Sequence, residues 1–97
     1  MTDVDVTERS GVFHVVVREE SSETSHDVGI PGDYMTRLGL EHVDGAALVV
    51  ESFYFLLERE PKESIMRRFE LSVIERYFPE YETRIGTTGD GSVQGRP

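Results

Sequence analysis

The stretch that decides the fold reads Ala46-Ala-Leu-Val-Val-Glu-Ser-Phe-Tyr-Phe-Leu-Leu57, followed by Glu-Arg-Glu-Pro61. Between residues 46 and 57 only Glu51 and Ser52 are polar, so a helix here would have a very narrow polar edge. Such a helix must be covered on several sides, and we therefore expect it to form the core. Asp44 is a suitable N-cap, and a residue before proline disfavours the α region, which predicts an end at Glu60.

Two segments of alternating residues precede this helix, at 12–18 and 24–30. Their β-branched and aromatic content is typical of strands, and the polar residues between them are typical of a turn. We expect an antiparallel hairpin whose apolar residues share one face, since a one-residue slip would turn one set to solvent. The predicted pairs are Phe13 with Ile30, Val15 with Val28 and Val17 with His26, around a loop centred on Ser21 and Ser22.

A short helix is predicted over Tyr34–Leu38, with Asp33 as its N-cap and Gly39 at its end. Its buried side would consist of Tyr34, Met35 and Leu38.

Further helices are expected after the central one. Pro61 suits the first turn of a helix that would bury Ile65, Met66 and Phe69. Ser72 and Glu75 have the spacing of a capping box and predict a fresh helix start. The next apolar face would contain Ile74, Tyr77 and Phe78, with Tyr81 and Ile85 continuing beyond Pro79.

The chain of 97 residues has the length of one domain. Residues 1–10 are expected to form a flexible arm, in which the alternation of Val4 and Val6 offers a short extra strand. Residues 86–97 are rich in glycine and are expected to be a disordered tail. Residues 11–85 then form a single α+β domain, an N-terminal antiparallel hairpin packed on three to four helices. The hairpin alone cannot bury all the aromatic side chains of the central helix. The remaining ones are covered by the helices after Pro61, which we favour, or by a second subunit in a homodimer.

Charge and composition exclude several classes of function. The formal net charge of −9 disfavours nucleic acid and anionic membranes, and no segment is long and apolar enough for a membrane span. A cytoplasmic location is expected, and the absence of cysteine removes thiolate chemistry. Lys62 is the sole lysine beside nine arginines. A halophilic source and a GC-rich coding bias both explain this composition.

No cluster in the sequence has the spacing that a particular chemistry requires, so we predict no catalytic residue, no cofactor and no metal ligand. In the predicted register, His14 and His26 point to opposite sides of the sheet, which argues against a shared metal ion. His42 with Glu41 and Asp44 is the remaining metal alternative. Glu51 would suggest function only if buried, and we expect Glu51 and Ser52 to mark a solvent-facing edge.

The segment 24–60, with its run Ile30-Pro-Gly-Asp-Tyr-Met-Thr-Arg-Leu38 before the long helix, resembles the ribbon–helix–helix regulators and antitoxins. That resemblance implies an intertwined dimer in which the strand meets the DNA major groove. The outward residues here are Ser25, Asp27 and Gly29, which are not the basic or amide side chains of that family.

A second likeness rests on Glu51-Ser-Phe53, Phe55-Leu-Leu-Glu-Arg-Glu-Pro-Lys-Glu-Ser-Ile65 and Arg76-Tyr-Phe-Pro-Glu-Tyr81. These residues are similar to a family of small uncharacterised archaeal and bacterial proteins with a β part followed by a helical half. The resemblance implies no activity.

The best prediction is therefore a small acidic, non-enzymatic adaptor or regulatory protein that acts on an unidentified protein partner. The alternative is a dimeric ribbon–helix–helix-like transcription regulator or antitoxin, in which arginines after the central helix meet phosphates. Because Phe53, Tyr54 and Phe55 cannot all face one core, one of them should reach a surface or a partner, and Tyr54 with its polar tip is the expected one. The predicted partner-contact residues are Tyr54, Arg67, Arg68, Arg76 and Tyr81.

Overall fold

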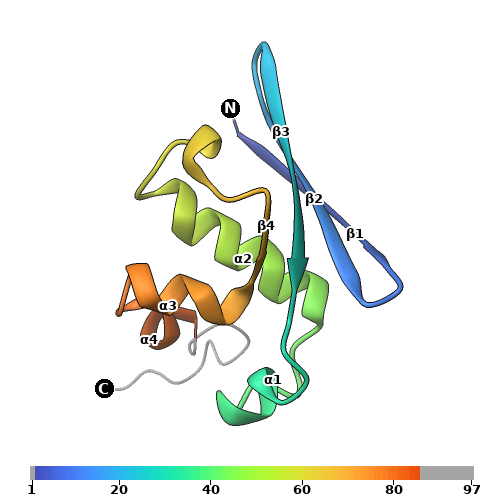
Figure 1. Cartoon of the computed structure of the whole chain (residues 1–97), viewed down its shortest axis with the longest axis vertical. Coiled ribbons are helices and arrows are strands. Elements are labelled where there is room, and N and C mark those ends of the chain that lie inside the picture. Colours follow the sequence, from blue (N-terminus) through green and yellow to red (C-terminus); the bar gives the residue numbers. More distant parts are fainter. Residues whose placement is uncertain (1, 86–97) are drawn as a thin grey trace.

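A four-stranded mixed sheet forms one layer of the fold, and helices cover one of its faces (Figure 1). The computed structural model describes residues 2–85. Strands β1 (Asp3–Arg9), β2 (Val12–Glu19) and β3 (Ser22–Gly29) form an antiparallel meander. The short strand β4 (Arg68–Glu70) adds to β3 in parallel. The α+β class is confirmed, and the expected hairpin is enlarged into a sheet.

The segment expected to be a flexible arm provides strand β1, which pairs with β2 along its whole length. Val4 and Val6 lie on its inner side and pack against the core. Ser10 and Gly11, at φ 52° and 82°, make the two-residue turn into β2. Positive φ at both turn positions matches the twist of a hairpin, so this turn favours the extra strand.

The register of β2 and β3 differs by two residues from the predicted one. Phe13 lies opposite Val28 rather than Ile30, and the hairpin closes between Glu19 and Ser22. The loop is therefore shorter than expected. Because side chains alternate with a period of two, a shift of two residues keeps the predicted apolar set on the inner face.

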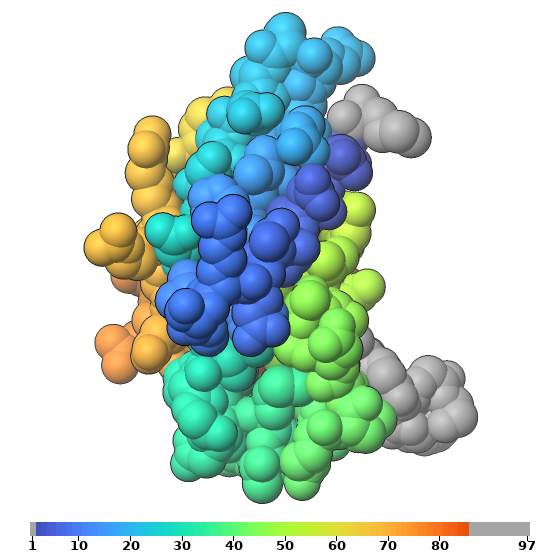
Figure 2. Space-filling view, turned by 90° about the vertical axis from the view of Figure 1, so that its right-hand side faces the viewer, coloured from blue at the N-terminus to red at the C-terminus, as the bar shows by residue number. Residues whose placement is uncertain are grey.

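Helix α2 (Gly45–Leu57) packs against the inner face of the sheet and ends three residues before the predicted limit. Figure 2 shows its green residues beside the dark-blue β1. Helix α1 (Tyr34–Arg37) buries Tyr34 as expected, while Met35 and Leu38 are partly buried.

The predicted helix after Pro61 is wrong. A single 3₁₀ turn (η1, Lys62–Ser64) leads into an extended segment and β4. Ile65 and Phe69 are buried, but Met66 is exposed. A spacing of four residues fits one face of a helix and one face of a strand equally well, so the pattern was ambiguous.

The remaining elements are short: the 3₁₀ turn η2 (Leu71–Val73) and the helices α3 (Ile74–Tyr77) and α4 (Tyr81–Ile85). The predicted capping box is wrong, because Val73 is the N-cap of α3 and no side chain caps it. Tyr77 was expected in the apolar face but is 65% exposed.

The first and last residues of α4, Tyr81 and Ile85, are buried as predicted. The predicted tail at 86–97 lies outside the described residues. Within residues 2–85, no helix combines the length and the apolar character that crossing a bilayer requires.

Candidate functional site

An apolar groove of about 190 Å³ lies between the end of α2, the segment before β4, and α3. It combines residues that are distant in sequence, because β4 runs along the sheet and α3 returns beside α2. Its apolar lining consists of Leu56, Ile65, Met66, Phe69, Ile74, Tyr77 and Phe78. Glu60 and Ser64 supply the polar atoms of the lining.

Two large side chains of this groove face solvent. Met66 is 42% exposed and Tyr77 is 65% exposed, whereas the neighbouring Ile65, Phe69 and Ile74 are buried. The groove therefore has a packed floor and open apolar walls. Ligand pockets for drug-sized molecules measure roughly 300–1,000 Å³, so this groove is better matched to one large side chain than to a whole small molecule.

His26 holds the backbone at Met66, next to the groove. Its Nδ1 donates to the Met66 carbonyl at 2.8 Å, and the Thr24 hydroxyl donates to Nε2 at 2.8 Å. Burial lowers the pKa of His26, and the carbonyl bond opposes that shift only in part. This histidine is a neutral structural link between β3 and the groove wall.

Glu60 is a partly buried carboxylate in the lining, and burial raises its pKa. Within the described part of the chain it has no hydrogen-bond or ion-pair partner among the side chains. A carboxylate that has lost water without gaining a cation is stabilised by a positive ligand group. Glu60 therefore gives the groove a preference for a cationic neighbour.

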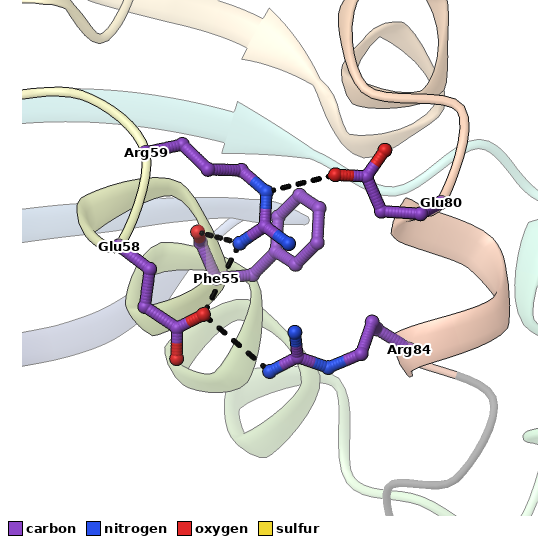
Figure 3. A network of polar contacts seen from close by, with 5 residues as sticks. All are labelled: Phe55, Glu58, Arg59, Glu80 and Arg84. Atoms are coloured by element: carbon purple, nitrogen blue, oxygen red, sulfur yellow. Dashed lines mark hydrogen bonds and ion pairs between the residues drawn. The ribbon is translucent and has the colours of Figure 1, made fainter.

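Polar contacts of Arg59 and Glu58 surround Phe55, the neighbour of the groove residue Phe78 (Figure 3 shows the contacts around Phe55). The Arg59 guanidinium lies 3.7 Å from the centre of the Phe55 ring, and its Nε donates to Glu80 at 3.0 Å. Phe55 in turn makes an edge contact with Phe78, with ring centres 6.0 Å apart.

The same group of contacts includes two from Glu58, which lies 3.2 Å from Arg59 and 3.5 Å from Arg84. The end of α2 is thereby fastened to the segment around Pro79 and to α4.

The predicted contact residues do not form one surface. Tyr54 is 42% exposed on α2, Arg67 and Arg68 are exposed at β4, and Arg76 is exposed on α3. Tyr81 is fully buried, so its side chain does not reach a surface. Burial raises its pKa, because the ionised phenolate would be desolvated.

The solvent-facing edge predicted for Glu51 and Ser52 on α2 is wrong at Ser52. Glu51 is exposed as expected, but Ser52 is fully buried and donates to the Leu48 carbonyl at 2.8 Å. Its Oγ also lies 2.6 Å from the Tyr81 hydroxyl. Serine tolerates burial here because its hydroxyl has partners on both sides.

The three histidines lie apart. His14 is on the exposed face of the sheet, His26 on the buried face, and His42 in the loop before α2. Among residues 2–85, no group of three or more His, Asp or Glu side chains is placed to share a metal ion.

Lys62 has a structural role that no sequence pattern predicted. Its side chain is 2% exposed, and Nζ donates to Glu63 at 2.7 Å, Glu19 at 2.9 Å and Ser22 at 2.7 Å. These bonds raise its pKa, with Glu63 as the largest cause and Glu19 next. They fasten the β2–β3 turn to η1, and the available signal was a single lysine in a chain that otherwise uses arginine.

Comparison with protein-family models, curated proteins and solved structures finds no match to this chain.

Proposed function

We propose that this chain is a small acidic, non-enzymatic adaptor or regulatory protein whose groove takes a large apolar side chain from a basic segment of a partner protein. The observation that carries the proposal is the open apolar groove with Met66 and Tyr77 exposed beside a packed floor. Exposed apolar surface of this kind is typical of interaction sites, and a few buried anchors supply most of the affinity in such contacts.

The charge of the chain favours a basic partner. The formal net charge is −9, and Glu60 adds a desolvated carboxylate at the groove itself. A lysine or arginine beside the inserted side chain would pair with Glu60 and lower the cost of its burial. Attraction over the whole surface would also raise the association rate at low salt.

Three buried side chains with shifted pKa values are explained by packing alone. Tyr34, His26 and Tyr81 owe their pKa shifts mainly to burial, and each has a hydrogen-bond partner within the chain. Structural packing therefore explains them without a reaction.

The ribbon–helix–helix alternative has less support. In that architecture the strand of one subunit pairs with its symmetry mate, whereas β3 lies between β2 and β4 of the same chain. A gel shift with random-sequence DNA at low salt tests it directly, since phosphate contacts are strongest there.

A random-peptide display library, selected on the purified protein, tests the proposal. We expect enriched peptides with a large apolar residue close to Lys or Arg. Tyr77→Ser should weaken their binding by about tenfold or more, as loss of a binding anchor does. Tyr54→Ser is the matched control, because it removes an exposed tyrosine outside the groove and should leave binding unchanged. Enrichment of acidic peptides, or equal weakening by both variants, would contradict the proposal.

A further inference from the structure

A polar hollow of about 370 Å³ lies along β2, β3 and the segment that enters β4, and its residues His14, Ser25 and Asp27 belong to the sheet face opposite the helices. The strand register sets its residues in a row, with His14 opposite Asp27 and Asp27 opposite Arg68. Ser25, Arg67 and the buried His26, which comes from the inner face of β3, complete the lining. Figure 2 shows this exposed side, with the gold residues around β4 beside the cyan and blue strands.

Two adjacent arginines in this hollow are not neutralised by the protein. Within residues 2–85, neither Arg67 nor Arg68 has a side-chain hydrogen bond or a carboxylate within 4.0 Å. By contrast, Arg18 lies within 3.6 Å of three carboxylates, and Arg59 is held between Glu58 and Glu80. Arg67 and Arg68 differ from the other arginines of the described residues in being adjacent, without a carboxylate within 4.0 Å, and in lining the same hollow.

The remaining charges of the hollow are arranged around these arginines. Asp27 accepts a hydrogen bond from His14 Nδ1 at 3.0 Å, and this bond orients the imidazole. The second ring nitrogen, Nε2, does not take part in the bond to Asp27. The Asp27 amide donates to the Arg67 carbonyl at 2.7 Å and fixes the backbone there. Two guanidinium charges therefore stand against one carboxylate that is already engaged with a histidine.

We propose that this hollow binds the phosphate group of a small phosphomonoester. Guanidinium groups present planar pairs of N–H donors that match phosphate oxygens, and Ser25 and His14 supply further polar groups at the same place. A carboxylate has only two oxygens to accept these donors, whereas the terminal phosphate of a monoester has three and carries nearly two charges. The volume of the hollow leaves room for part of the organic group.

Titration with O-phosphoserine, followed by the imidazole signals of the three histidines in the NMR spectrum, tests this site. At low ionic strength, where screening is weak, we expect a saturable shift of the His14 signal. The His42 signal, from a loop outside the hollow, serves as the internal reference. Inorganic phosphate should compete for the same site, because the shared chemistry is the phosphate group.

Variants separate this site from general electrostatics. Arg67→Gln with Arg68→Gln should weaken binding by about tenfold or more, because charge-assisted hydrogen bonds are lost. Arg76→Gln removes an exposed arginine on α3 and should leave the affinity unchanged. Both arginine sites are exposed, so the variants are expected to fold, and unchanged circular dichroism checks this. The proposal is overturned if O-phosphoserine gives no saturable His14 shift, if Arg76→Gln weakens binding equally, or if only an oligonucleotide binds.

Discussion

The hydroxyl groups of Ser52 and Tyr81 are buried and join α2 to α4. Removing either of them should lower the free energy of unfolding by a predictable amount. Both side chains are fully buried, and their oxygens lie 2.6 Å apart. Ser52 uses its only proton for the Leu48 carbonyl, so Tyr81 must donate to Ser52. Tyr81→Phe removes that donor and leaves Ser52 its other bond, which should cost about 1 kcal/mol of unfolding free energy.

Ser52→Ala should cost more than Tyr81→Phe. It removes the acceptor and strands a fully buried Tyr81 hydroxyl, a change worth about 2–3 kcal/mol. The double variant leaves no orphaned hydroxyl, so its loss should be about 1 kcal/mol smaller than the sum of the single losses.

Urea unfolding at fixed salt, followed by circular dichroism, measures all four proteins of this cycle. A cycle with strictly additive losses would refute the reasoning. A larger loss for Tyr81→Phe than for Ser52→Ala would also refute it, because that result would show that Tyr81 does not donate its proton to Ser52.

Three further predictions concern pH, backbone and stacking. Burial lowers the pKa of His26 in the folded chain, so the unfolded chain binds a proton at this residue more readily. The free energy of unfolding should therefore be unaffected by His26 above pH about 6.5 and should fall as the pH drops from there towards the pKa of the folded state. His26→Gln should remove that part of the slope in urea unfolding. Gly39→Ala should cost about 1–2 kcal/mol because φ is 73°. Gly32→Ala, also with open space at its Cβ and without positive φ, should stay within about 0.5 kcal/mol in thermal melts. Arg59→Lys keeps the charge but loses the planar stack on Phe55, so the melting temperature should fall by a few degrees, corresponding to about 1 kcal/mol.

The regular elements of the first half were predictable because their periodicity is unambiguous. Phe13, Val15 and Val17 alternate cleanly, and the run from Ala46 to Leu57 is long enough to exclude a strand. The pairing register was predicted two residues away because both registers bury the same face, and the sequence pattern does not measure turn length.

The second half was less predictable because its elements are short and their patterns admit two structures. Ile65 and Phe69 fit a helix face as well as a strand face. Ser72 and Glu75 have capping spacing, yet Ser72 lies inside a 3₁₀ turn. Local signals of a few tenths to about 1 kcal/mol are readily overridden by tertiary packing.

The candidate groove could not be predicted as a site, because no local motif encodes it. Leu56, Met66 and Tyr77 come from three segments that are distant in sequence and lie together only in the folded chain. Three consecutive aromatic residues on α2 cannot all face one core, which did predict that one of them would be exposed, and Tyr54 is. It did not predict the exposure of Tyr77, because that depends on where α3 lies relative to the sheet.

Methionine-methyl NMR tests the central proposal most directly, since the chain has three methionines, of which Met66 lines the groove and Met35 lies within α1. A peptide that combines a large apolar residue with an adjacent lysine or arginine should shift the Met66 methyl signal saturably and leave the Met35 signal in place. Tyr77→Ser should abolish the shift and Tyr54→Ser should not. A peptide that binds while the Met66 signal stays unmoved would contradict the assignment of this groove as the partner site.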